Sequence, residues 1–160
     1  MSYKDTNAPT GVILTLVFLA ALPLLSLNMF LPSLDVMAQE FSVGYDAMAL
    51  TISTYLLFTA IIQIISGHVA DRVGRRPVVL FGLAIFILAS IGCVQAESYQ
   101  TFFIWRVLQG AIVTASVLSR AIVSDLFTVK KSASILSYIA MGMSIAPILG
   151  PALGGVISEI

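Results

Sequence analysis

The sequence predicts an all-α membrane protein with five transmembrane helices, and two observations lead to this fold class. Hydrophobic residues make up 59% of the chain and charged residues only 10%, whereas an ordinary soluble domain has about 25% charged residues. The hydrophobic residues also gather in five long runs that contain few charges or none. A soluble fold could not cover this much apolar surface, so we expect lipid to surround the helices.

The first run covers residues 6–34 and contains no Asp, Glu, Lys or Arg. A membrane-spanning helix needs about 20 apolar residues, so we expect a helix at 11–34. A cleaved signal peptide is the alternative. Against it, the run is longer than the hydrophobic part of a signal peptide, and residues 28–32 (NMFLP) lack the small residues of a cleavage site.

The second and third runs are also free of those four residue types, and they predict helices at 47–68 and 77–96. Between them lies SGHVADRVGRRP, residues 66–77, with four charges and two glycines. Gly74 suits a turn that needs a positive φ angle, and Pro77 suits the first turn of the next helix.

The fourth and fifth runs predict helices at 102–126 and 134–157, and only the fourth carries charges, on Arg106, Arg120 and Asp125. An arginine inside a span costs on the order of several kcal/mol unless it snorkels to the interface or finds a partner. Arg106 lies about one helical turn from the predicted helix end. Snorkelling is therefore one explanation, and a position inside the bundle is the other.

The charges outside the spans predict the orientation. With the N-terminus in the cytoplasm, the basic residues outside the spans lie on the cytoplasmic side. The charged residues of the outer loops are then all acidic, which follows the positive-inside rule. The cytoplasmic set is Lys4, Arg72, Arg75, Arg76, Lys130 and Lys131, and the outer set is Asp35, Glu40, Asp46 and Glu97. We therefore expect a multi-pass protein with a cytoplasmic N-terminus.

The segment GHVADRVGRRPVVL resembles the signature loop between helices 2 and 3 of the major facilitator superfamily, roughly G-x-L-A-D-R-x-G-R-R/K-x-x-L. Val69 stands where leucine is usual. Gly67, beside the loop, would let another helix approach closely. The positions that match the motif are Gly67, Asp71, Arg72, Gly74, Arg75 and Arg76. The resemblance implies a transporter built from a helical bundle.

The fourth span carries a second motif of this family. Its RVLQG is similar to R-x-x-Q-G, on Arg106, Gln109 and Gly110. The resemblance implies that Arg106 faces the bundle interior, that it assists proton coupling, and that these residues belong to the substrate cavity.

The fifth span carries a third motif, because GPALGG at residues 150–155 resembles the motif of facilitator-type proton antiporters, which are exporters. Small residues recur every fourth position on one helix face, where they let two backbones pack tightly. Generic helix packing is the alternative reading of this stripe. Pro147 and Pro151 would bend the helix. The motif and stripe residues are Gly142, Ala146, Gly150, Pro151, Gly154 and Gly155.

Two flanking segments narrow the resemblance to the bicyclomycin/chloramphenicol-resistance (Bcr/CflA) branch of drug:proton antiporters. NMFLPSLDVMAQEF and SRAIVSDLF look like its D-M-Y-L-P-A-L-P and A-R-A-I-x-x-D-L-F patterns. Asn28 stands where the branch usually has aspartate, and Asp35 where it has proline. Asn28 cannot titrate, so a proton-carrying role is not transferred to it. We still expect Asn28 to face the substrate cavity, with packing against a neighbouring helix as the alternative.

The length of the chain predicts that it is an N-terminal fragment. Facilitator transporters have two six-helix halves with the substrate site between them, whereas the resemblance here covers residues 1–160 with five helices. We expect the C-terminal half to be absent and the fragment alone to be inactive in transport.

The function that the resemblance implies is secondary active transport across a bacterial inner membrane, with export of drugs or small amphipathic metabolites in exchange for protons. The alternatives are a facilitator that imports a metabolite and a non-transporting membrane assembly protein. We expect lipid, protons and a small-molecule substrate as partners. We expect no enzyme activity, cofactor, metal or nucleic acid, because metal-ligand spacing, a phosphate loop and a paired nucleophile and base are absent from the sequence and its net charge is zero.

Asp71, Arg75 and Asp125 predict one charge cluster at the cytoplasmic edge. Asp71 and Arg75 are four residues apart, so they can meet on one helix face. The fourth helix runs inward, which brings Asp125 to the same edge. We predict that this cluster latches helices 2 and 4 in the outward-open state, since a guanidinium can hold two carboxylates. The alternative is that all three are solvated orientation signals.

Overall fold

The computed structural model describes residues 9–158, which are almost entirely helical and contain no strand, so the predicted all-α class is confirmed. Five helical segments in this part of the chain are long and apolar enough to cross a membrane. The elements are α1 (Thr10–Phe30), the 3-10 turn η1 (Leu31–Ser33), α2 (Leu34–Glu40), α3 (Tyr45–Val73), α4 (Arg75–Val94), α5 (Tyr99–Leu108), the 3-10 turn η2 (Gln109–Ile112), α6 (Val113–Leu126) and α7 (Val129–Ser158).

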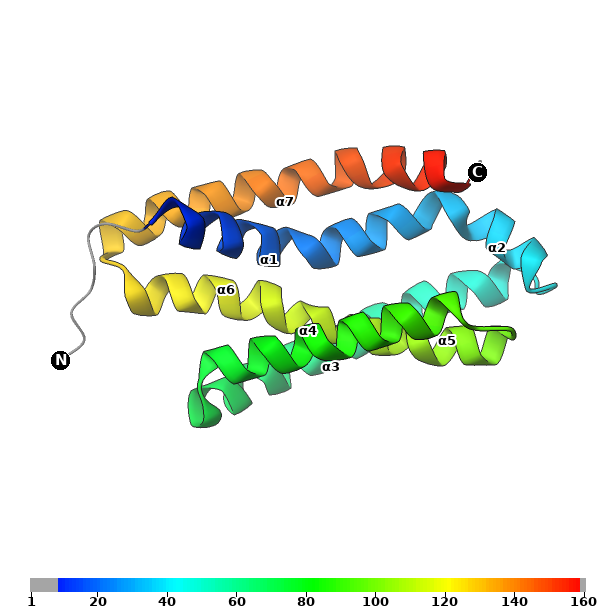
Figure 1. Cartoon of the computed structure of the whole chain (residues 1–160), viewed down its shortest axis with the longest axis horizontal. Coiled ribbons are helices and arrows are strands. Elements are labelled where there is room, and N and C mark those ends of the chain that lie inside the picture. The colour runs from blue at the N-terminus through cyan, green and yellow to red at the C-terminus, as the bar shows by residue number, and fades with distance from the viewer. Residues whose placement is uncertain (1–8, 159–160) are drawn as a thin grey trace.

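The helices form one elongated bundle in which all the long segments run along the same axis (Figure 1). α1 lies along α7 and also contacts α6, while α3 and α4 pack against the continuous α5–η2–α6 segment. This segment is the centre of the bundle: 56% of its most apolar window is buried, against 11–22% for the other four spans. The fourth span is therefore the most enclosed by this chain, and it contacts α1, α3, α4 and α7.

Several helices are longer than the sequence predicts. The first span continues beyond residue 34 through η1, where Pro32 lies, into α2 and ends at Glu40. The second span ends at Val73 instead of residue 68, and the third begins at Arg75. Only Gly74 separates them, with φ +101°. The predicted turn at Gly74 is confirmed, and most of the signature segment is helical because few residues are needed to reverse the chain at this glycine.

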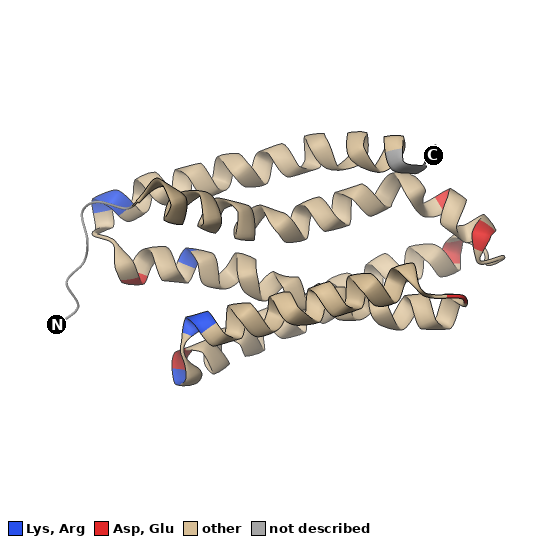
Figure 2. Ribbon diagram, viewed as in Figure 1, with Lys and Arg blue, Asp and Glu red and all other residues tan. Residues whose placement is uncertain are grey.

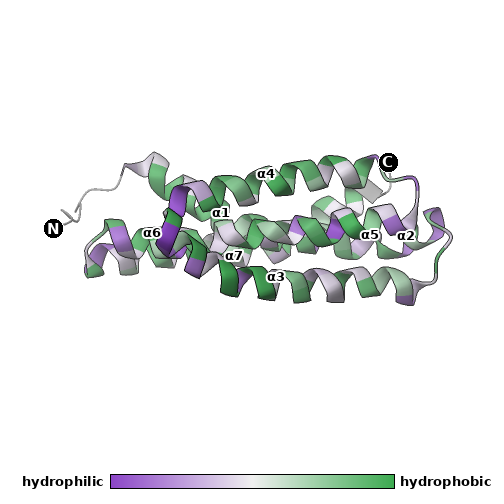
Figure 3. Cartoon of the chain, turned by 90° about the horizontal axis from the view of Figure 1, so that it is seen from below, coloured by the Kyte–Doolittle hydropathy of each residue, from purple (hydrophilic) through white to green (hydrophobic). Residues whose placement is uncertain are grey.

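One end of the bundle carries basic residues together with Asp71 and Asp125, and the other end carries acidic residues (Figure 2). Lys130 and Lys131, at the start of α7, lie at the same end as the α3–α4 turn with its arginines. The acidic residues of α2, of the start of α3 and of the α4–α5 connection lie at the other end. Lys4 lies outside the described residues. Between the two ends the helices are mostly hydrophobic (Figure 3). The separation of charge that the sequence predicts along the chain is thus a separation in space.

Candidate functional site

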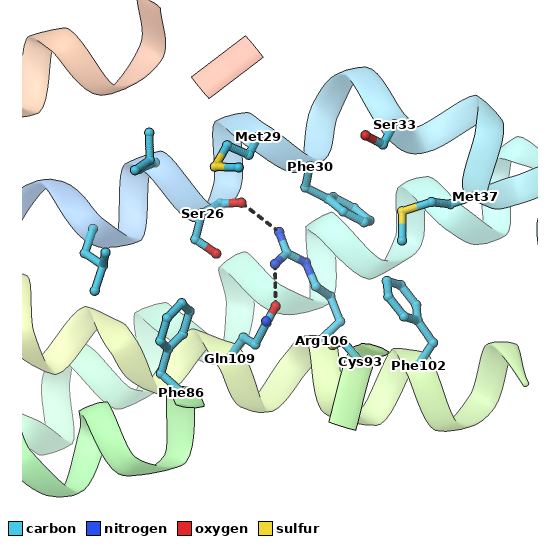
Figure 4. Close-up of a pocket in the computed structure, with 12 residues that line it drawn as sticks. Ser26, Met29, Phe30, Ser33, Met37, Phe86, Cys93, Phe102, Arg106 and Gln109 are labelled. Atoms are coloured by element: carbon cyan, nitrogen blue, oxygen red, sulfur yellow. Dashed lines mark hydrogen bonds between the residues drawn. The ribbon is translucent and has the colours of Figure 1, made fainter. Parts of the chain in front are cut away.

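A buried arginine lies in the middle of the bundle. Arg106 on α5 is only 4% exposed, so it does not snorkel to the interface. Its Nη1 donates a 2.5 Å hydrogen bond to Oε1 of Gln109, and its Nη2 donates a longer bond of 3.4 Å to the backbone carbonyl of Ser26 (Figure 4). The guanidinium therefore joins α5 and η2 to α1.

Two aromatic rings complete the surroundings of this guanidinium. Cζ of Arg106 lies 4.2 Å from the ring centroid of Phe30 on α1 and 4.9 Å from that of Tyr55 on α3. A cation over an aromatic face is attracted by the electrons of the ring. These contacts, together with two neutral oxygens, are what stabilise the positive charge of Arg106 inside the bundle.

A chain of hydrogen bonds orients Gln109. Nε2 of Gln109 donates to Oγ of Ser90 at 2.9 Å, and that hydroxyl donates its proton to the backbone carbonyl of Phe86 at 2.7 Å. Because the hydroxyl proton of Ser90 is already used, Ser90 can only accept from Gln109. The amide oxygen of Gln109 must then face Arg106, which is the orientation that a cation requires.

A cavity of about 370 Å³ lies next to this network, between α1 and the α4–α5 side of the bundle (Figure 4). Arg106 is the only charged residue that the structure places in its lining; the other residues are apolar or small and polar. Nε of Arg106 and the hydroxyl of Tyr55 are buried without a hydrogen-bond partner. The lining consists of Leu22, Leu25, Ser26, Met29, Phe30, Ser33, Met37, Phe86, Cys93, Phe102, Arg106 and Gln109.

Two residues that the sequence assigns to the substrate cavity do not line this one. Asn28 donates a 2.7 Å hydrogen bond to the backbone carbonyl of Leu24 and packs against Gly150 of α7. Gly110 faces Phe58 and Thr59 of α3, and a Cβ at Gly110 would lie 2.9 Å from the Phe58 ring. Both residues make close contacts with a neighbouring helix in this structure, which for Asn28 is the alternative stated above.

The three charges of the predicted cluster meet at the basic end of the bundle. Nε and Nη2 of Arg75 point at the two carboxylate oxygens of Asp125, with Nη2 3.5 Å from Oδ1. Nη2 also lies 3.6 Å from Oδ1 of Asp71. Arg75 thus bridges α3, α4 and α6. Both carboxylates are largely exposed, Asp71 at 70% and Asp125 at 53%, so water screens these ion pairs strongly.

Other residues of the signature segment lie outside the charge cluster. A Cβ at Gly67 would meet no atom within 4 Å, so no helix of the described residues approaches closely there, and the expected close approach stays a prediction. Arg72 and Arg76 are exposed at the end of the bundle. Their position fits contact with lipid headgroups or water.

The small-residue stripe of α7 packs against α1. A Cβ at Gly142 would overlap Val17, one at Gly150 would crowd Asn28, and one at Gly154 would overlap the backbone of Met29. Ala146, in the same stripe, is 3% exposed. The remaining motif residues lie elsewhere: Pro151 is exposed, and a Cβ at Gly155 would meet no atom within 4 Å.

The family model that describes the Major Facilitator Superfamily matches residues 16–160, which is most of the chain and includes all of these motifs.

The chain belongs to the Major Facilitator Superfamily.

Similar facilitator proteins come from bacteria and fungi. The chain is 31% identical over 151 residues to "Multidrug resistance protein D" of Escherichia coli K12, which covers 94% of this chain and 38% of that protein. It is 34% identical over 132 residues to "Multidrug resistance protein MdtL" of Klebsiella pneumoniae, covering 82% of this chain and 34% of the relative. It is 29% identical over 136 residues to the fungal "MFS-type transporter phiD", and the match covers 84% of this chain and 21% of that protein. The chain therefore spans between a fifth and two fifths of these relatives.

Sequence reasoning missed the residues that hold Arg106 in this facilitator. Phe30, Tyr55 and Ser90 belong to three different helices, and no motif relates them to one another. Ser90 stands in an apolar run, where a single hydroxyl usually bonds to its own helix backbone. Its bond to Phe86 follows that rule, whereas its bond to Gln109 depends on how α4 docks against η2.

Proposed function

We propose that this chain is the N-terminal part of a proton-coupled facilitator that exports drugs or small amphipathic metabolites across a bacterial inner membrane. The observation that carries this proposal is the buried Arg106–Gln109 pair at the edge of an apolar cavity. A charged group inside a membrane bundle is costly and usually marks a substrate or ion pathway. The names of the bacterial relatives support efflux of drugs.

The C-terminal half of the transporter is part of this proposal. Substrate sites in facilitators lie between two helical halves that rock against each other. The five spans described here supply one wall and part of the interior. We propose that the chain alone does not transport and that the second half closes the site from the opposite side.

The N-terminus of the proposed transporter lies in the cytoplasm. The basic end of the bundle, with Arg72, Arg76, Lys130 and Lys131, then faces anionic lipid headgroups on the cytoplasmic side. At this end the Arg75 cluster acts as a latch between helices. It is closed in the outward-open state and breaks when the halves rock, so Asp71 and Asp125 have a conformational role beyond orientation.

Transport by the full-length protein in proteoliposomes tests this function. An outward-directed substrate flux driven by an imposed pH gradient, and lost when an ionophore collapses that gradient, is the expected result. The 160-residue chain, reconstituted in the same way, is the matched control and should give no flux. A substrate flux that does not depend on the pH gradient would refute proton coupling. Inward accumulation of the substrate would favour the alternative function, a facilitator that imports a metabolite.

A further inference from the structure

We infer that the cavity beside Arg106 binds the anionic end of the substrate, so that the transporter prefers carboxylates and similar monoanions to amines. This inference rests on the proposed transport function and names the substrate class for that site. It follows from the charge of the cavity, from the unused hydrogen-bonding capacity of the guanidinium, and from the chemistry of the remaining walls.

The charge of the cavity is positive and is not compensated. Arginine stays protonated in proteins, and Arg106 is 4% exposed. Its contacts are the amide oxygen of Gln109, the carbonyl of Ser26 and two aromatic rings, all of them neutral. Within the described part of the chain, no Asp or Glu lines the cavity. A buried charge without an opposite charge is unfavourable, so an anion gains more here than a neutral group and a cation is repelled.

One edge of the guanidinium has unused hydrogen-bonding capacity for a carboxylate. Nε of Arg106 has no hydrogen-bond partner, and Nη2 has only the 3.4 Å bond to Ser26. Arg75 of this same chain uses the corresponding Nε and Nη2 atoms to hold both oxygens of Asp125. A carboxylate that takes the same two-point geometry at Arg106 approaches in the plane of the guanidinium, and because Nε is buried, the side chains that cover it must move aside.

The rest of the cavity suits an apolar body attached to that anion. Leu22, Leu25, Phe86 and Phe102 supply hydrophobic walls, with a few small polar groups between them. The volume of about 370 Å³ lies within the range of small-molecule sites, roughly 300–1,000 Å³. The expected ligand is thus an amphipathic acid of modest size, with its charge at Arg106 and its ring or chain against the leucines.

Three fluorescent compounds with the same ring system test this inference: naphthylacetic acid, naphthylacetamide and naphthylethylamine. Their binding to the full-length protein in detergent and their transport in proteoliposomes are measured at neutral pH. We expect the acid to bind at least about tenfold more tightly than the amide, and the amine most weakly, because only the acid pairs with the guanidinium. Equal affinities, or tighter binding of the amine, would overturn the inference.

Two pairs of variants separate charge recognition from loss of folding. Arg106→Gln should remove the preference for the acid, whereas Arg120→Gln should keep it, since Arg120 contacts Ser116 and Met143 away from the cavity lining. Ser26→Asp introduces a negative charge into the cavity lining, at a residue whose backbone carbonyl contacts Arg106. It should abolish binding of the acid, while Ser26→Asn should not. Retained acid preference in Arg106→Gln or in a folded Ser26→Asp protein would contradict the inference.

The two proposals fail differently in this experiment. If the acid binds selectively through Arg106 but none of the three compounds is transported against a pH gradient, the proposed export function is wrong and the anion site stands. If the amine or amide is transported as well as the acid, export stands and the anion preference is wrong.

Discussion

A methyl group added at Gly154 tests whether α1 and α7 are in backbone contact. The Cβ of Gly154→Ala would overlap the carbonyl oxygen of Met29 and lie 3.0 Å and 3.1 Å from its carbonyl carbon and Cα. Carbon atoms normally approach to about 3.5–4.0 Å. The obstructing atoms belong to the backbone, so a rotamer change cannot relieve the overlap and the two helices must separate.

The neighbouring Gly155 provides a matched control, because a Cβ there would meet no atom within 4 Å. Both substitutions exchange glycine for alanine inside α7, and both gain about 1 kcal/mol of helix propensity. This gain cancels when the variants are compared with each other. The difference that remains is the cost of overpacking at Gly154, about 1–3 kcal/mol.

Thermal unfolding of the purified chain in detergent micelles, followed by circular dichroism, measures this difference. A change of 1 kcal/mol shifts the melting temperature by about 2–4 °C for a protein of this size. The Gly154→Ala variant should therefore melt roughly 2–12 °C below Gly155→Ala. Equal melting temperatures for the two variants would show that the helices are not in backbone contact at Met29. In the full-length transporter, Gly154→Leu should also abolish transport, and normal transport would be equally damaging to the tight-packing argument.

Three further predictions concern the polar residues of the transporter and use transport by the full-length protein. Asn28→Asp adds a titratable group, so the pH dependence of efflux should change; an unchanged profile with intact transport would argue against a role in substrate or proton handling. Asp71→Asn should impair transport, while cysteine-accessibility mapping should show an unchanged membrane topology. Full transport activity of this variant would leave Asp71 with a role in membrane orientation only. Ser90→Ala removes the acceptor that orients Gln109, so transport should fall by about tenfold as one hydrogen bond is lost and Arg106 is misaligned. Ser90→Thr, which keeps the hydroxyl, should restore most of that rate, and equal rates for the two variants would refute the positioning role.

The fold class could be predicted because it depends on properties of the chain itself. Long apolar runs without charges require lipid as solvent, and backbone groups in lipid must be satisfied within a helix. The number of spans follows from these rules, and the confirmed turn at Gly74 follows from the tolerance of glycine for a positive φ angle. Helix ends were less predictable: the second span continues past charged residues to Val73, because charges at a membrane surface do not stop a helix.

The motifs identified which residues matter but not always what they contact. Arg106 and Gln109 are three residues apart on consecutive helical turns, so their bond follows from local geometry. Asn28 was expected either at the substrate cavity or against a neighbouring helix, and its contact with Gly150 was not indicated by any motif. A pattern along one helix shows that two residues share a face, but it does not say which neighbour that face meets.

By itself, the sequence determined the lipid environment, the five spans, the separation of charge and the family motifs, because each of these is written in composition and spacing along the chain. The tertiary structure alone decided that Phe30 and Tyr55 lie against Arg106, that Ser90 orients Gln109, and that the cavity contains a cation without a carboxylate. Those contacts join helices distant in sequence. They depend on the rotation and depth at which each helix docks, which the packing of small residues and ring faces sets once the helices meet.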